Sequence, residues 1–222
     1  CWIGRRDLIA DRLVDDSAFV RRAIIRMFEQ STEIQIIDVA SDGEMALELV
    51  KKHHPDVITL DVQMPVLDGL QALERIMYEC PVPVIMLSSL TGKGGELTLK
   101  ALDLGAVDFI DKSSAGGSMD ISGLARELTV KIKIAARIDL KKLKTVEPSV
   151  SVARAVPLTS TRLTDTEMVI IGTSTGGPPA LQAILVKIPA NFPCPILVVQ
   201  HMSLGFTAPL AERLDRLCPL RV

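Results

Sequence analysis

The chain has 222 residues, of which 48% are hydrophobic and 23% charged, a balance typical of a folded protein with a sizeable core. Its formal net charge of −2 excludes a globally basic surface for nucleic-acid binding. No apolar run approaches the roughly 20 residues of a membrane span. The four cysteines form no CxxC pair, which argues against a zinc site or disulfide framework. We therefore expect a cytoplasmic protein that is not itself a membrane protein.

Strand and helix patterns alternate over the first part of the chain. The expected strands cover residues 8–14, 34–40, 57–60, 82–87 and 106–110, and the expected helices cover 18–29, 43–52, 70–78, 96–104 and 121–140. Most of these strands are apolar throughout, as in a parallel sheet covered by helices on both faces. We predict an α/β fold with a doubly wound, parallel five-stranded domain over residues 7–128.

The first expected strand is an exception, because it carries Asp11 and Arg12 where a central strand should be apolar. Burying this pair would cost several kcal/mol unless both charges had good partners. We therefore expect either a frayed strand or a stretch of residues, 1–12, that is not native to the protein.

Polar residues follow the strand ends of this block: Asp15 and Asp16, Asp61, Ser88 and Lys112. In an open parallel sheet the carboxyl ends of the strands line one crevice. Crowded carboxylates favour a divalent cation, and oxygen ligands with water suit Mg²⁺. A lysine and a hydroxyl opposite them would bind phosphoryl oxygens. Asp61 is central and could attack phosphorus to form an aspartyl phosphate.

These segments resemble the response-regulator receiver domain. The similarity lies in residues 14–17, 60–65, 68–69, 87–89 and 105–112. It implies that Asp61 accepts phosphate from a histidine kinase, and that Asp16 and Asp61, with Asp15 and the backbone carbonyl of Gln63, hold Mg²⁺. It also implies that Lys112 contacts the phosphate and that Ser88 and Phe109 couple it to the surface. Ser113 departs from the pattern, since receivers usually have proline there.

A second block follows the receiver-like region. The helix expected to end at residue 140 has a basic outer face that includes Lys131, Lys133 and Arg137, which we interpret as solvated. Residues 129–166 are expected to form the helix end and an interdomain linker, because residues 145–166 are rich in Ser, Thr, Val and Pro without a clear period. Strands are then expected at 168–171 and 195–199, and helices at 178–187 and 207–217.

A glycine-rich turn, residues 172–177 (GTSTGG), directly follows the first strand of this block. A dinucleotide-binding loop is one interpretation, but Ser174 occupies the place of its middle glycine. A purely structural turn is another. A nucleophilic serine at a strand end fits best, because His201 ends the neighbouring strand and could act as its base. Backbone N–H groups at the following helix start could bind an oxyanion.

The segments 171–177, 199–207 and 211–214 are similar to the catalytic domain of chemotaxis protein-glutamate methylesterases. That resemblance implies a receiver, a linker and the first portion of a Rossmann-like catalytic domain over residues 167–222. It implies hydrolysis of γ-glutamyl methyl esters on chemoreceptors, and glutamine deamidation in many members. Ser174 would be the nucleophile and His201 the base, no cofactor would serve the esterase, and the receiver would block the site until Asp61 is phosphorylated.

The catalytic acid of that family lies further along its chain than residue 222, and the last acid here, Asp215, matches no motif. We therefore expect the catalytic domain to be C-terminally truncated, and residues 168–222 alone to be weakly folded and catalytically silent, because two strands leave open edges. The alternative is a response regulator with a signalling or DNA-binding output. A DNA-binding output would need a basic recognition helix, which the second block lacks.

Overall fold

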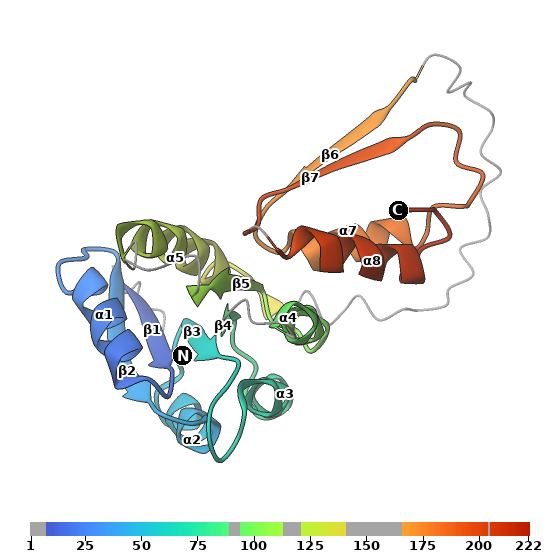
Figure 1. Cartoon of the computed structure of the whole chain (residues 1–222). Helices are drawn as coiled ribbons and strands as arrows, with labels where there is room; N and C mark the ends of the chain where they lie inside the picture. The colour runs from blue at the N-terminus through green and yellow to red at the C-terminus, as the bar shows by residue number, and fades with distance from the viewer. Residues whose placement is uncertain (1–7, 89–93, 113–120, 141–165, 204) are drawn as a thin grey trace.

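A computed structural model describes residues 8–88, 94–112, 121–140, 166–203 and 205–222. The described chain forms two lobes, one containing five strands and the other two (Figure 1). Among the described helices, none is long and apolar enough to cross a membrane.

The first lobe is a parallel sheet with the strand order β2-β1-β3-β4-β5. Helices cover both faces of this sheet, so the predicted doubly wound α/β fold is confirmed. The elements are β1 (Ile9–Val14), α1 (Ala18–Phe28), β2 (Ile34–Ala40), α2 (Gly43–His53), β3 (Val57–Asp61), α3 (Gly69–Glu79), β4 (Val84–Ser88), α4 (Gly94–Asp103), β5 (Asp108–Asp111) and α5 (Ile121–Ala135).

Side-chain caps fix where the helices of this lobe begin. The Ser17 hydroxyl accepts a hydrogen bond from the N–H of Val20, so α1 starts directly behind the end of β1. Asp68 and Gln71 form a reciprocal capping box at the start of α3. A Cβ at Gly69 would collide with the carbonyl oxygen of Asp61, so only glycine allows α3 to begin so close to the end of β3. These short connections hold the strand ends in one tight group.

The pair Asp11 and Arg12 is fully buried in β1, so the expectation of a frayed strand is wrong. The pairing of β1 with β2 shifts register between these two residues, which places Asp38 opposite Arg12. Asp38 forms an ion pair with the guanidinium at 3.7 Å, but Arg12 has no hydrogen bond from any of its three nitrogens to the described residues. Strand pairing on both sides of β1 holds the pair inside the sheet in spite of this cost.

The helix α5 ends at Ala135, short of the expected residue 140, and its Lys131 is buried. The ammonium group donates a hydrogen bond to the carbonyl oxygen of Phe109 at 2.5 Å and pairs with Asp108 and Glu127, each at 3.2 Å. Lys131 therefore does not belong to a solvated basic face. It instead ties α5 to β5.

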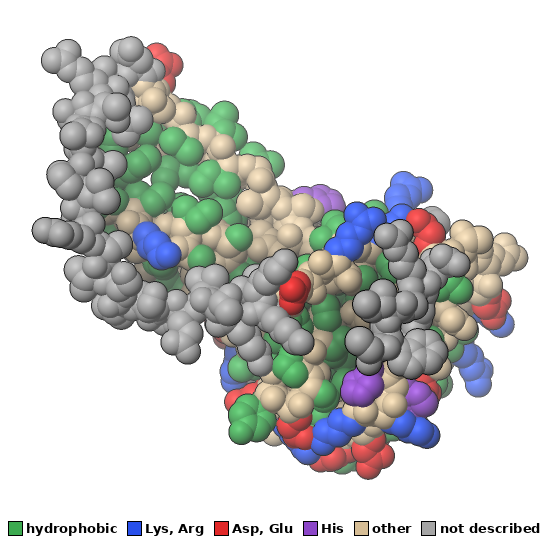
Figure 2. All heavy atoms as spheres, turned by 180° about the vertical axis from the view of Figure 1, so that it is seen from behind, with side chains coloured by type: hydrophobic (Ala, Val, Ile, Leu, Met, Phe, Trp, Pro, Cys, Tyr) green, Lys and Arg blue, Asp and Glu red, His purple; other side chains and the backbone are tan. Residues whose placement is uncertain are grey.

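The second lobe pairs β6 (Val169–Thr173) with β7 (Ile196–Gln200) and packs α7 (Gly177–Leu185) and α8 (Thr207–Leu217) on one face of the two strands. The other face carries the neighbouring side chains Ile170, 67% exposed, and Leu197, 49% exposed. Figure 1 shows no described element over this face, and Figure 2 shows hydrophobic side chains gathered on this lobe. One layer of its core is therefore uncovered among the described residues.

The two lobes meet where α4 packs against α7 and α8. Phe109 of the edge strand β5 contacts Phe206 in a tilted ring pair, with centroids 4.3 Å apart and 43° between the ring planes. Arg213 of α8 forms an ion pair with Asp103 of α4 and also donates hydrogen bonds to Gln182 of α7. Apolar residues of α7 and α8 belong to the same buried cluster as the α2–α4 side of the first lobe. The interface is therefore a continuation of the core.

Candidate functional site

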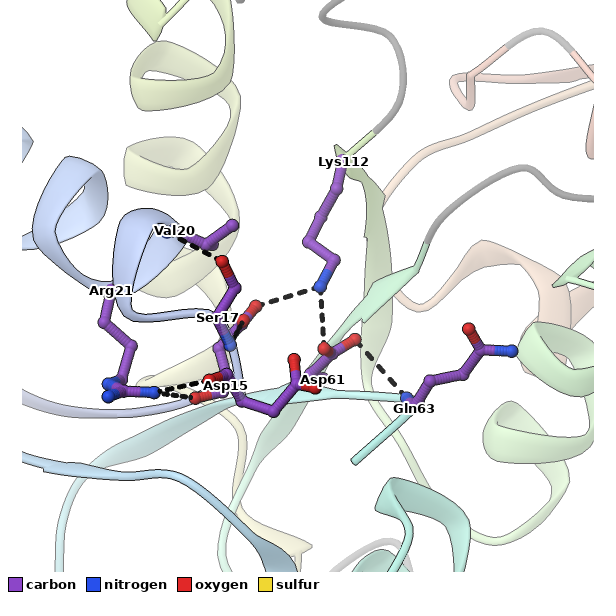
Figure 3. Close-up of polar contacts among 8 residues, drawn as sticks. Asp15, Ser17, Val20, Arg21, Asp61, Gln63 and Lys112 are labelled. Atoms are coloured by element: carbon purple, nitrogen blue, oxygen red, sulfur yellow. Dashed lines mark hydrogen bonds and ion pairs between the residues drawn. The ribbon is translucent and has the colours of Figure 1, made fainter. Parts of the chain in front are cut away.

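The strand ends of the first lobe bring Lys112 between two buried carboxylates (Figure 3). Its ammonium nitrogen lies 2.7 Å from Asp61 Oδ2 and 2.9 Å from Asp15 Oδ2. Burial alone would lower the pKa of Lys112, but the charges of Asp61 and Asp15 outweigh it and raise that pKa. The lysine therefore keeps its positive charge and partly neutralises a group of acids that would otherwise repel one another.

Oxygen atoms of Asp15, Asp16 and Asp61 lie within 4.8 Å of one another, so a single cation could contact all three. A set of carboxylate oxygens fits Mg²⁺, which prefers hard oxygen ligands and retains water. Gln63 turns its side chain away from the carboxylates, and its backbone N–H donates to Asp61 Oδ1 at 3.4 Å. A cavity of about 200 Å³ beside these groups is lined by Asp16, Asp61, Val62, Gln63, Ser88, Leu97 and Lys112. The predicted strand-end residues thus surround a space where a phosphoryl group could bind.

Burial raises the pKa of Asp61 to about 6, against the opposing effect of Lys112. Because this folded-state value is above the ordinary one, the carboxyl of the metal-free chain is expected to be neutral below about pH 6 and charged above it. Mg²⁺ favours the charged form, so 10 mM magnesium should move the midpoint downward. Carbon-13 NMR of the Asp61 carboxyl, assigned with Asp61→Asn, measures both midpoints. A midpoint below pH 5 without metal would contradict this prediction.

The two expected coupling residues lie beside the interface between the lobes. Phe109 contacts the second lobe directly, and Ser88 contacts α4, which packs against that lobe. The hydroxyl of Thr98 in α4 donates a hydrogen bond to the hydroxyl of Ser88 at 2.9 Å, and both side chains are buried. The ring of Phe109 contacts that of Phe206, which is five residues after His201. A change at the carboxylate cavity could therefore reach the second lobe through α4 or through this ring pair.

The second lobe places Ser174 and His201 together at the ends of β6 and β7. Ser174 Oγ lies 3.3 Å from His201 Nδ1, and both residues are exposed. An open cavity around them is lined by residues 172–174 and 199–202, with no contribution from the described part of the first lobe. The predicted serine–histidine contact is therefore present. The described receiver residues do not cover it directly.

No carboxylate of the described residues lies within ion-pair distance of His201. The carboxylate of Asp215 accepts a hydrogen bond from the backbone N–H of Val222 instead. In the Ser-His-Asp arrangement, the ring nitrogen that does not face the serine is held by an acid. Here the nitrogen facing Ser174 is Nδ1, which leaves Nε2 without such a partner among these residues.

The start of α7 is a poor anion site, contrary to the expectation from sequence. Its first residue, Gly177, donates its N–H to the carbonyl oxygen of Ser174 at 2.8 Å, and the next two residues, Pro178 and Pro179, have no N–H. The N–H groups of Thr175 and Gly176 have no hydrogen bond within the described structure. These two N–H groups, which lie next to Ser174 in the chain, therefore remain available for an oxyanion.

Comparison with known proteins finds matches to both lobes. The profile of the response regulator receiver domain matches residues 12–120, and that of the CheB methylesterase matches residues 169–222. The crystal structure of the response regulator domain of Thermotoga maritima CheB superposes with a TM-score of 0.55 at 41% identity, covering 60% of this chain and 98% of that one.

Curated relatives match across both lobes. A protein-glutamate methylesterase/protein-glutamine glutaminase from Lawsonia intracellularis is 46% identical over 220 residues, covering 95% of this chain and 62% of the relative. Another from Syntrophomonas wolfei is 47% identical over 214 residues, covering 95% and 60%. The chain belongs to the protein-glutamate methylesterase family. It spans about three fifths of the length of these methylesterase relatives.

Sequence reasoning missed two residues, Gln200 beside the Ser174–His201 pair and Thr98 beside Ser88. Gln200 precedes His201 in the chain, but a single glutamine at a strand end gives no signal of its hydrogen bonds. Thr98 lies ten residues after Ser88 on α4, and its contact depends on how that helix packs. Pairing the two strands of the second lobe in register would have placed Gln200 opposite Thr173 and beside the serine turn.

Proposed function

We propose that the chain provides the receiver and the nucleophilic part of a phosphorylation-regulated protein-glutamate methylesterase. Its substrates would be methyl-accepting chemoreceptors, on which it would also deamidate glutamine. The contact between Ser174 and His201, in a chain that also carries a phosphoacceptor cavity, is the observation that carries this proposal. A chemotaxis histidine kinase would be its phosphodonor, and the cytoplasm its location.

Ester hydrolysis would follow the serine-hydrolase route. Ser174 Oγ attacks the γ-carbonyl carbon of the glutamyl methyl ester while His201 takes the serine proton. The C–O bond to the methoxy group then breaks, His201 returns the proton, and methanol leaves. Water, deprotonated by His201, attacks the acyl-enzyme and releases glutamate and free Ser174. The unbonded N–H groups of Thr175 and Gly176 would stabilise the oxyanion. With glutamine as substrate, ammonia leaves instead of methanol.

The receiver would act through Asp61. A carboxylate oxygen of Asp61 forms a bond to phosphorus as the P–N bond of the kinase phosphohistidine breaks. Asp15, Asp16 and Asp61, with the backbone carbonyl of Gln63, would hold Mg²⁺, which when bound offsets the negative charge gathered on the phosphoryl group. Lys112 lies within reach of both buried carboxylates and would bind a phosphoryl oxygen.

Phosphorylation would reach the esterase through the interface between the lobes. A phosphoryl oxygen would attract the Ser88 hydroxyl, which now accepts from Thr98 of α4. Movement of α4 would pull on the ion pair between Asp103 and Arg213 and so shift α8. Movement of Phe109 would break its ring contact with Phe206. Phe206 lies five residues after His201 in the chain. A displacement of Phe206 would therefore also shift the proposed base. A DNA-binding output is disfavoured, since the second lobe is strand–helix–strand–helix.

The proposal predicts methanol release that depends on Ser174. Over long incubations with carboxyl-[³H]methylated chemoreceptors, the chain is expected to release volatile counts above a protein-free blank. Ser174→Ala should reduce them to the blank, because the nucleophile is gone. A phosphorylated chain should release methanol faster than an unphosphorylated one, and Asp61→Asn should remove only that increase. Release that does not exceed the blank, or that survives Ser174→Ala, would contradict the proposed function.

A further inference from the structure

Gln200, the last residue of β7, makes three hydrogen bonds with the amide group of its side chain. Its Oε1 accepts from the Thr173 hydroxyl at 2.6 Å. Its Nε2 donates to the carbonyl oxygen of Ser174 at 2.9 Å and to that of His201 at 3.0 Å. One side chain therefore contacts the backbone of both residues of the proposed catalytic pair.

These bonds complete the fixation of the Ser174 peptide group. Its carbonyl oxygen accepts from Gln200 Nε2 and also from the N–H of Gly177 at 2.8 Å, so both lone pairs are used. The peptide plane after Ser174 therefore has a single favoured orientation. The backbone that carries Oγ is thereby held on the C-terminal side of Ser174.

The backbone of His201 is held in the same way. Its N–H donates to the carbonyl oxygen of Thr173 at 2.9 Å, and its own carbonyl oxygen accepts from Gln200. Thr173 and Gln200 are directly opposite each other in the parallel pair. The amide of Gln200 thus bridges the two strand ends at the level from which the serine and the histidine project.

Gly177 supplies the space for this amide. A Cβ at Gly177 would overlap Gln200 Oε1, and it would also lie 2.9 Å from the Cβ of Thr173. The serine turn can therefore close over the glutamine only with glycine at this position. Among the glycines of this turn, only Gly176 has a positive φ, at 73°. Gly177 is therefore explained by the space that the amide of Gln200 needs and not by its backbone conformation.

We propose that Gln200 is a positioning residue that keeps Ser174 Oγ within reach of His201. This inference rests on the proposed function, because it assigns Gln200 to the same Ser174–His201 pair. Gln200 contacts no reacting atom, so its loss would leave the chemistry intact and change only the geometry. A displacement of about 1 Å in such a pair costs up to roughly a hundredfold in rate.

The test measures how fast a fluorophosphonate probe labels Ser174 in the 222-residue chain, with Ser174→Ala as the blank. Gln200→Met keeps the bulk of the side chain but makes none of the three bonds, so we expect labelling 10 to 100 times slower. Thr173→Val should slow labelling several-fold, and Thr173→Ser, which keeps the hydroxyl, should restore the wild-type rate. Gly177→Ala should slow labelling strongly on its own and less than additively with Gln200→Ala, because the two share the contact with Gln200 Oε1 while the clash with the Cβ of Thr173 remains.

The readouts separate positioning from a simple loss of folded protein. Positioning lowers the rate constant while the final labelled fraction and phosphorylation of Asp61 stay unchanged. A lower final fraction at an unchanged rate constant, or wild-type rates in Gln200→Met, would overturn the proposal. NMR cross-peaks between Ser174 Hβ and the His201 ring, expected in the wild type and lost in Gln200→Met, test the geometry without any probe. Absent labelling with intact cross-peaks would refute the nucleophile and leave the positioning role standing, whereas cross-peaks that persist in Gln200→Met would refute that role.

Discussion

The 222-residue chain is expected to hydrolyse a glutamyl methyl ester about four orders of magnitude more slowly than its relative from Lawsonia intracellularis. The reason is the state of His201, which has no carboxylate partner among the described residues. In the serine-protease template, replacing the orienting acid lowers kcat by about 10⁴, because the imidazole then occupies the wrong tautomer. The uncovered face of β6 and β7, where Val199 is 58% exposed, also leaves the site on a loosely supported scaffold.

The measurement compares initial rates of methanol release by the two proteins on the same methylated receptor, both phosphorylated to the same extent. Ser174→Ala in this chain, and the matching change in the relative, define the background of each protein. A rate for this chain within tenfold of the relative would show that His201 obtains its orientation without an acid from the described residues. It would also show that the sheet of β6 and β7 alone holds Ser174 and His201 in a reactive geometry.

The pattern of the sequence was sufficient to predict the elements whose ends are set locally. The strand Ile34–Ala40 and the helix Thr207–Leu217 coincide with the expected ranges. The strand expected at 106–110 begins only at Asp108, because the N–H of Ala106 still bonds to Ala101 of α4 through a turn in which Gly105 has a φ of 104°. Such a boundary depends on how a helix is closed, which periodicity does not record.

The first site was predictable because a general rule of parallel sheets applies to it. Asp61 and Ser88 end their strands, Asp15 and Lys112 directly follow theirs, and the ends of parallel strands meet at one edge. The same reasoning predicted that Ser174 and His201 lie together at the ends of neighbouring strands. It failed for Lys131, because helical spacing made this residue look like part of a solvated face. Its three partners come from β5 and from its own helix, and only the packed structure shows that they surround it.

Replacing Arg12 by leucine is expected to raise the free energy of unfolding of the first lobe by about 1 kcal/mol, the low end of the gain from replacing a whole buried ion pair, because Asp38 stays behind with only a partly exposed carboxylate. The Arg12 guanidinium is fully buried, makes no hydrogen bond to the described residues and has its nearest carboxylate, Asp38, at 3.7 Å. Burial also lowers its pKa, against the charges of Asp38 and Asp11. The cost of removing this charge from water is therefore poorly compensated, and an apolar side chain among buried neighbours avoids it. Hydrogen exchange of the β3 amides measures the change for this lobe alone.

Lys131→Met is the matched control, because Lys131 is the other buried cation among the described residues of this lobe. Lys131 is fully partnered, so its loss removes a donor from the carbonyl oxygen of Phe109 and leaves the carboxylate of Asp108 without its cation, with only the N–H of Phe109 still donating to it among the described residues. We expect this variant to lose about 3 kcal/mol, the opposite sign to Arg12→Leu. Equal destabilisation by both substitutions would show that Arg12 has a partner that outweighs its burial.

Asp11 gives the same region a dependence on pH whose sign can be derived. Burial raises the pKa of Asp11 to about 7, although the Thr59 hydroxyl donates to both of its oxygens. Because the folded state binds this proton more tightly than the unfolded state, where the pKa is near 3.8, the contribution of Asp11 to stability declines as pH rises from about 4 to 7. The decline is on the order of 4 kcal/mol from a shift of about three pKa units.

Asp11→Asn keeps an acceptor for Thr59 but cannot titrate, so it should flatten this part of the profile of stability against pH. An unchanged slope in Asp11→Asn would assign the pH dependence to another group, and a rising slope in the wild type would mean that Asp11 is charged in the folded chain. The chain would then hold two buried charges in one strand, and Arg12→Leu should destabilise it.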